Sequence, residues 1–214
     1  MEPATRRAAA ARETRRRVVA AAQAEFLERG YPATTIREIA ARAGVSQETV
    51  YKTFGGKAGL LKAAYDVAMA GDDEPIPIRD RPEARAVQDA TTPGAAATAY
   101  AALAALLVTR AGALTRIVLA GRGASAEVEE FAAVTDAERL TGTGAAVGHW
   151  ERVGWLRPGL SEKRARDIVW MLNSPAVYVL AGERGWGVEE YRDWLADALL
   201  ALVLDPAAAP VGLA

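Results

Sequence analysis

The stretch TTIREIAARAGVSQETVYKTFGGK, from Thr34 to Lys57, decides the fold that we expect for this chain. Apolar residues fall on one face of a short helix at residues 36–43 and on one face of a second short helix at residues 47–54. Gly44 ends the first helix, and the second follows almost at once. Two short helices joined by a tight glycine turn, behind a longer helix, predict a helix-turn-helix unit.

Both short helices start with residues that suit helix capping. Thr35 precedes the first helix, and Glu38 three residues later completes a capping box. Ser46 can cap the second helix, where Val45 and Val50 are placed as a hydrophobic staple. These local signals predict where each helix begins.

The rest of the chain has a helical pattern, without a run of β-branched alternation long enough for a strand. A first helix is predicted at residues 12–29, ended by Gly30, and a fourth at residues 57–70. An acidic linker with prolines follows at residues 71–84. Later helices are predicted at residues 83–89, 95–119, 126–153, 162–182 with a kink at Pro175, and 189–204.

The second short helix exposes a mixture of hydrogen-bonding groups. With Val50 at the centre of its buried face and Phe54 beside it, a turn of about 100° per residue directs a short polar face outward. Such a helix fits the DNA major groove, where glutamine can pair with adenine, threonine can touch a thymine methyl and glutamate can accept from cytosine. Lysine and tyrosine can bind phosphate oxygens. The polar face comprises Gln47, Glu48, Thr49, Tyr51 and Lys52.

Charge is unevenly distributed along the chain. The whole chain has 26 Lys and Arg against 27 Asp and Glu, whereas residues 1–60 have eleven basic and six acidic side chains. A basic N-terminal head, residues 1–60, followed by an acidic body, suggests that the head binds a polyanion. A solvated basic face would give the same count. The stretch TRRAAAARETRRR, residues 5–17, can add a flexible arm whose arginines enter an adjacent minor groove. Alternatively, Arg15, Arg16 and Arg17 only begin the first helix and contact the DNA backbone.

At these residues the sequence strongly resembles the tetracycline-repressor (TetR) family of bacterial transcription regulators. The resemblance covers residues 17–68 and rests on TTIREIAARAGVSQETVYKTFGGKAGLLKA, preceded by AAQAEFLERGYPATT. It implies a DNA-binding head on an all-helical body that senses a ligand and forms a dimer. Thr53 departs from the pattern, since many members carry His or Tyr there, and small residues are common at the position of Glu48. The implied DNA-binding residues are Thr35, Arg37, Ser46, Gln47, Glu48, Thr49, Tyr51, Lys52 and Lys57.

The C-terminal half contains all five tryptophans. Aromatic side chains with a few polar groups suit a small-molecule pocket, and they equally suit a helical core or a dimer seam. The candidate residues for binding an unknown effector are Tyr100, Leu103, Leu107, His149, Trp150, Trp170, Asn173 and Val177.

The resemblance places a homodimer seam on the last two long helices, and their apolar stripes allow it. The stripes can instead close the core of their own chain. The candidate seam residues are Ile168, Leu172, Val179, Leu180, Leu195, Leu199, Leu202 and Val203.

No catalytic, metal or cofactor site is expected. The chain has no cysteine and a single histidine, His149, which excludes thiolate and His-rich metal sites. Glycine-containing fragments at Gly121 and Gly142 lack the βαβ setting that dinucleotide binding needs. The charged N-terminus is no secretory signal, and the most apolar stretch, residues 95–108, is short and rich in alanine for a membrane span. We therefore expect a cytoplasmic chain that is not an enzyme and does not contact a membrane.

The expected fold is all-α, with a helix-turn-helix three-helix DNA-binding domain at residues 1–58, a helical-bundle ligand and dimerisation domain at residues 59–206, and a tail at residues 207–214. The predicted function is a repressor that binds a palindromic double-stranded DNA operator as a dimer and is released by a small-molecule effector. The alternative is a ligand-independent helix-turn-helix DNA binder whose body serves only dimerisation.

Overall fold

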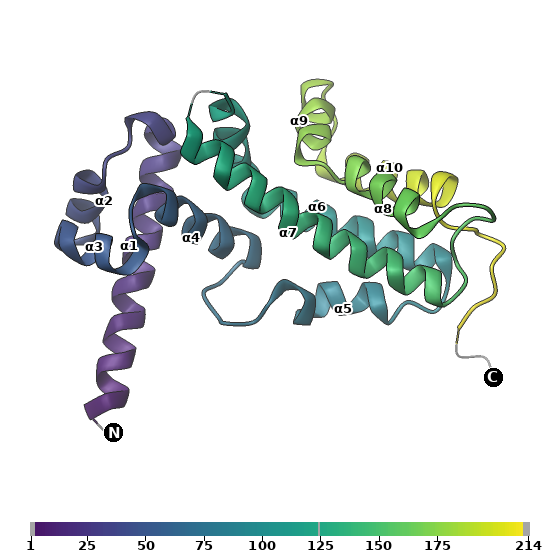
Figure 1. The fold of residues 1–214 in the computed structure, drawn as a ribbon, viewed down its shortest axis with the longest axis horizontal. Coiled ribbons are helices and arrows are strands. Elements are labelled where there is room, and N and C mark those ends of the chain that lie inside the picture. Colours follow the sequence, from purple (N-terminus) through teal and green to yellow (C-terminus); the bar gives the residue numbers. More distant parts are fainter. Residues whose placement is uncertain (1–2, 124, 212–214) are drawn as a thin grey trace. The chain divides into compact units, whose positions relative to one another are not determined.

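The computed structural model describes residues 3–123 and 125–211. These residues form ten α-helices and one 3-10 helix, and their extended pairing is limited to an isolated bridge between Leu156 and Leu204 (Figure 1). The all-α expectation is therefore confirmed. In chain order the elements are α1 (Pro3–Ala33), α2 (Ile36–Ala43), α3 (Gln47–Phe54), α4 (Lys57–Ala70), the 3-10 helix η1 (Ile78–Asp80), α5 (Pro82–Gln88), α6 (Pro93–Gly121), α7 (Ala126–Arg152), α8 (Glu162–Leu172), α9 (Pro175–Glu183) and α10 (Val188–Leu202).

The chain divides into two compact units. Unit 1 consists of Met1–Glu74 and Arg110–Ala132, and unit 2 consists of Pro75–Thr109 and Ala133–Ala214. Helices α6 and α7 each contribute residues to both units.

The first division between the units falls inside the predicted linker rather than between residues 58 and 59, where the sequence suggested a domain boundary. The reason is the packing of α4. Its residues Leu60 and Leu61 are buried in the core of unit 1, so α4 belongs with the three helices before it.

The core of unit 1 lies where α1 to α4 meet. Phe26, Ile39, Val50 and Leu60, one from each helix, are fully buried there. Burying one such side chain stabilises the fold by about 1.5–3 kcal/mol. Because Val50 is one of these four, α3 is anchored through its apolar side and its opposite side faces outward.

The helices of unit 1 follow the predicted bounds closely, except at the start of α1. Helices α2, α3 and α4 span the predicted residues. Helix α1 starts at Pro3 instead of residue 12, so the arginines of the N-terminal segment lie on a helix and not on an extended arm. Alanines at residues 8–11 favour this extension. Gly30 breaks the helical geometry with φ 75°, as the sequence predicted, although a further turn follows up to Ala33.

The predicted helix at residues 162–182 is two helices. Helix α8 ends at Leu172, and α9 starts at Pro175 with Ser174 as its N-cap. A proline removes a backbone donor and disfavours helical geometry in the residue before it, whereas its ring fits the first turn of a new helix. Pro175 therefore separates two helices instead of kinking one.

The C-terminal segment, where the sequence predicted a tail, is attached to unit 2 by hydrogen bonds. The Trp155 Nε1 donates to the Ala209 carbonyl at 3.0 Å, and the Val211 N–H donates to the Thr91 carbonyl at 3.0 Å. Residues 212–214 of the predicted tail lie outside the described residues.

Helix α6 is longer than the apolar stretch noted in the sequence. With 29 residues, it is long and apolar enough to cross a membrane by length and composition. The core helix of a soluble protein meets the same criterion, and α6 contributes buried residues to the cores of both units.

Candidate functional site

The helix-turn-helix is held by the caps that the sequence predicted. Thr35 Oγ1 accepts the Glu38 N–H at 3.3 Å, and Glu38 Oε2 accepts the Thr35 N–H at 3.1 Å. Ser46 Oγ accepts the Thr49 N–H at 3.1 Å at the start of α3. Gly44 connects the helices with φ 66° and ψ 40°, a left-handed conformation that favours glycine. The start and direction of α3 are thus fixed by local hydrogen bonds.

The polar face of α3 is exposed. Val50 is fully buried, whereas Gln47, Glu48, Tyr51 and Lys52 are exposed, Tyr51 by 54%. The outward face therefore combines an amide, a carboxylate, a phenol and an ammonium group on a helix short enough for the major groove. This is the arrangement that the sequence predicted.

The serine and threonine hydroxyls of the predicted DNA site have partners within the chain. Ser46 Oγ lies 2.9 Å from Thr49 Oγ1, and Thr35 Oγ1 donates to Glu38 Oε2 at 2.7 Å. Thr49 is also half-buried, while Arg37 on α2 is exposed. The threonine and serine hydroxyls thus hold the helix ends.

Lys57, the first residue of α4, is held against Tyr31. Its Nζ donates to the Tyr31 carbonyl at 2.9 Å and lies 4.3 Å from the centre of the Tyr31 ring. The Tyr31 hydroxyl in turn donates to the carboxylate of Glu127 at the start of α7. Lys57 is half-buried as a result, so a phosphate would have to share or replace these contacts.

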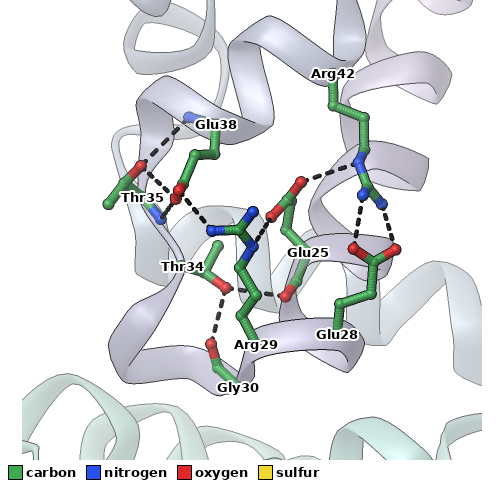
Figure 2. A network of polar contacts seen from close by, with 8 residues as sticks. All are labelled: Glu25, Glu28, Arg29, Gly30, Thr34, Thr35, Glu38 and Arg42. Atoms are coloured by element: carbon green, nitrogen blue, oxygen red, sulfur yellow. Dashed lines mark hydrogen bonds and ion pairs between the residues drawn. The ribbon is translucent and has the colours of Figure 1, made fainter.

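A network of five charged residues fastens α2 to α1 (Figure 2). At its centre is Glu25 of α1, whose side chain is only 5% exposed. Its carboxylate meets Arg29 Nε at 3.1 Å and Arg42 Nε at 2.9 Å. Arg42 also holds Glu28 through two bonds of 2.8 and 2.6 Å, and Arg29 holds Glu38 at 2.7 Å.

The network joins the α2 cap to the end of α1. Thr34 Oγ1 adds bonds to the carbonyls of Glu25 at 3.0 Å and Gly30 at 2.8 Å (Figure 2). Among these contacts, the sequence signals only the Glu25–Arg29 spacing of four residues. The partners of Arg42 are 14 or more residues away in the chain, so sequence analysis missed them.

Three of the predicted effector-binding residues, Tyr100, Trp170 and Asn173, meet in a partly buried polar cluster of unit 2. Asn173 Nδ2 donates to Tyr100 OH at 2.6 Å, and Thr143 Oγ1 lies 3.3 Å from the same hydroxyl. Arg139 Nη1 donates to Asn173 Oδ1 at 2.8 Å, and its guanidinium stacks 4.2 Å from the centre of the Trp170 ring. The cluster joins the end of α8 to α6 and α7. The sequence missed Arg139 and Thr143, although their spacing of four residues places them on one face of a helix.

Of the other predicted effector residues, Trp150 lies in the core of unit 2, and Leu103 and Val177 pack against this core. Trp150 packs edge-on to Tyr100 at 5.4 Å, and His149 packs edge-on to Trp155 at 6.0 Å. Burial raises the pKa of Tyr100 and lowers the pKa of His149, with Arg152 as the second cause for the histidine. Leu103, Leu107 and Val177 are half-buried.

Unit 2 also has a hollow at its surface. Its volume is about 670 Å³, within the range of ligand clefts, and it is open towards solvent. None of the predicted effector residues lines it. The lining residues are Pro82, Arg85, Ala86, Asp89, Ala90, Ala95 and Ala99.

Three of the predicted dimer-seam residues lie inside unit 2. Leu195, Leu199 and Val203 are fully buried in its core, so their surface is not available to a partner, and this part of the prediction is wrong. The stripe on α10 closes the core of its own chain, as the alternative held. Leu180 and Leu202 are 58% and 49% exposed. The half-buried members of the predicted seam are Ile168, Leu172 and Val179.

Comparison with known proteins identifies the head of the chain. Residues 18–64 match the family described as bacterial regulatory proteins, tetR family. The uncharacterized HTH-type transcriptional regulator TtgW of Pseudomonas putida is 36% identical over 80 residues, which cover 37% of this chain and 57% of that protein. The uncharacterized HTH-type transcriptional regulator YvkB of Bacillus subtilis is 42% identical over 52 residues, which cover 24% of this chain and 28% of that protein. The chain therefore spans about half or less of these relatives.

Solved structures match almost the whole chain. The SmeT–triclosan complex has a TM-score of 0.69 and 19% identity, and the match covers 94% of this chain and 97% of that one. A second SmeT structure, the repressor of the Stenotrophomonas maltophilia multidrug efflux pump SmeDEF, has a TM-score of 0.64 and 20% identity, with coverage of 94% and 98%. Because the sequence identity is only 19–20%, these matches show the fold alone.

The fold and the exposed face of α3 define a helix-turn-helix protein of the DNA-binding type. With the family match at residues 18–64, the helix-turn-helix part of this chain matches the TetR family of transcriptional regulators. The matched relatives and structures are transcriptional regulators, which agrees with the expectation that the chain is not an enzyme.

Proposed function

We propose that this chain is a repressor that binds a palindromic double-stranded DNA operator as a homodimer and is released by a small-molecule effector bound in unit 2. The exposed polar face of α3, held by a capped and ion-paired helix-turn-helix, carries this proposal. It places hydrogen-bonding groups of several kinds where base edges lie in the major groove.

The residues of α3 have different roles in DNA binding. Gln47 and Glu48 lie in the first turn, which in this motif meets base edges, while Tyr51 and Lys52 lie one turn later and bind phosphates. One head reads only a few base pairs. Two heads in a dimer read two half-sites whose centres lie about 34–36 Å apart.

Exposed apolar side chains support dimerisation through the C-terminal helices. Helix α9 has a mainly apolar sequence, yet it contains no fully buried residue. Met171 on α8, Leu180 on α9 and Leu202 on α10 are each about half exposed or more, from 49% to 58%. A second copy of the chain would remove these side chains from water.

An effector that is small and mainly apolar suits unit 2. The cluster around Tyr100 and Asn173 offers hydrogen-bonding groups within an aromatic and aliphatic core. Triclosan is the compound in the SmeT complex that shares this fold, and it is therefore a reasonable first compound to test. An effector that prefers a dimer with wrongly spaced heads lowers operator occupancy by its differential affinity. Such a regulator works in the cytoplasm without membrane contact, with α6 as a core helix.

The test starts with selection of an operator from random DNA by the full-length protein. Fluorescence anisotropy then compares wild type with Tyr51→Ala, which we expect to bind every sequence more weakly because it loses a phosphate contact. Thr53→Ser is the control and should bind as wild type, since it removes one methyl group from α3 and keeps the hydroxyl that donates to the Thr49 carbonyl. Equal operator binding by wild type and Tyr51→Ala would contradict the assignment of α3.

A thermal-shift screen separates the sensor from the ligand-independent alternative. Small apolar compounds are screened with the dimeric protein, and a hit raises the unfolding temperature in proportion to the logarithm of its concentration. A hit that also weakens operator binding supports the sensor. A hit that leaves operator binding unchanged favours the ligand-independent DNA binder.

A further inference from the structure

The N-terminal part of α1 is a basic helix that lies outside the core of unit 1. Residues 6–17 contain six arginines and one glutamate, and all but Thr14 are exposed. The first core residue of α1 is Val18. Figure 1 shows this part of α1 projecting beyond α2, α3 and α4.

The segment has no apolar face that the fold of unit 1 uses. Arg6, Arg7 and Arg12 have no ion-pair partner among the described residues, whereas Arg16 pairs with Glu13 and, at 3.6 Å, with Asp73. Uncompensated arginines on an exposed helix contribute nothing to the core, and their mutual repulsion opposes folding of the segment. An anionic partner removes this repulsion.

The basic helix is continuous with the surface that carries α3. The Arg15 guanidinium lies 4.9 Å from the centre of the Phe54 ring at the end of α3. Arg17 lies beside the turn before α3, where its Nη1 is 3.9 Å from the place that a Cβ on Gly44 would take. DNA bound on α3 therefore lies close to the base of this helix.

We propose that residues 6–17 form a helical arm that binds the phosphate backbone beside each operator half-site. The proposal rests on the proposed DNA binding by α3 and extends it to a second surface. Twelve helical residues span about 18 Å, equivalent to the rise of about five base pairs. The arginines are distributed around the helix, so the arm presents charge in several directions and suits phosphates more than a fixed pattern of base edges.

The test compares two triple variants of the full-length protein. The arm variant carries Arg6→Gln, Arg7→Gln and Arg12→Gln. The control variant carries Arg79→Gln, Arg85→Gln and Arg164→Gln, which removes the same charge from exposed positions of unit 2. Operator affinity is measured at several salt concentrations, and hydroxyl-radical footprints show which sugars are protected.

We expect the arm variant to bind the operator with a salt slope lower by about 2 to 3 per subunit, since each lost phosphate contact lowers it by about 0.9. Its footprint should lose protection beside each half-site and keep protection within it. Base preference and unfolding temperature should stay as in wild type, because the arm touches neither bases nor core. The control variant should keep both the slope and the footprint.

An arm variant with the slope and footprint of wild type would overturn the proposal. Wild type that binds no selected sequence would instead contradict the proposed function, so the two failures are distinguishable. If the arm variant binds no DNA and also unfolds at a lower temperature than wild type, the measurement is repeated with the single variants Arg6→Gln and Arg7→Gln. An unchanged salt slope in both single variants would reject the arm.

Discussion

At the scale of single residues, the outward face of α3 contains groups for base reading and groups for phosphate binding. Gln47→Ala should change base preference at one position in each half-site, at a cost of about 1–3 kcal/mol for the preferred base. Lys52→Ala should weaken binding to all sequences equally and lower the salt slope by about one per subunit. Affinity for a panel of single-base operator variants, measured at several salt concentrations, checks both. A uniform loss with Gln47→Ala would exclude base reading by this residue.

His149 gives a second residue-scale prediction, on pH. The pKa of His149 in the folded chain lies below the usual 6.5 because of burial and Arg152. As the pH falls, the unfolded chain therefore binds a proton on this histidine before the folded chain does. The contribution of His149 is therefore fully present above about pH 6.5 and declines as the pH falls below that value. Denaturant midpoints measured from about pH 7.5 to about pH 5 should fall for wild type by more than for His149→Gln.

The comparison with His149→Gln isolates this effect. His149 is the single histidine, and Glu151 is present in both proteins. The pKa of Glu151 is raised by burial and by Glu162, which gives a change of opposite sign in acid. Parallel curves for the two proteins would show that His149 keeps its usual pKa.

At the scale of elements, the Glu25 network joins α1 to α2 through charged side chains. Glu25→Ala leaves Arg29 and Arg42 without their shared carboxylate. We expect a loss of about 2 kcal/mol, the size of a hydrogen bond to a charged group, because both arginines can turn towards water and keep Glu38 and Glu28 as partners. Glu28→Ala is the matched control, since Glu28 is 54% exposed and an exposed pair contributes about 0–1 kcal/mol. Urea unfolding of both variants measures the difference, and equal losses would contradict a special role for Glu25.

At the scale of the whole molecule, two leucines of α10 distinguish the core from the dimer seam. Leu202 is 49% exposed, so Leu202→Glu should give a folded protein with weaker dimerisation and poorer operator affinity. Leu199 is fully buried, so Leu199→Glu should unfold unit 2 instead of producing a folded monomer. Light scattering with circular dichroism reports both results. A wild-type protein that is monomeric at micromolar concentration yet binds a palindrome tightly would contradict the dimer.

The bounds of α2 and α3, their caps and the outward face of α3 followed from the sequence alone. Each depends on residues within about four positions of one another. Thr35 with Glu38, and Ser46 with Thr49, can be read directly because a cap joins neighbours in the chain. The same local character makes the resemblance to the TetR family visible in residues 17–68.

Only the tertiary structure decided which residues meet across the fold. Arg42 meets Glu28 across 14 positions, and Asn173 meets Tyr100 across 73. A helical period shows that a residue is on an apolar stripe but does not show which helix covers it. That is why Leu199 was assigned to a dimer seam although it lies in the core of unit 2. The physical reason is that burial is a property of packing between distant segments, whereas helix starts and stops are set by hydrogen bonds between neighbours.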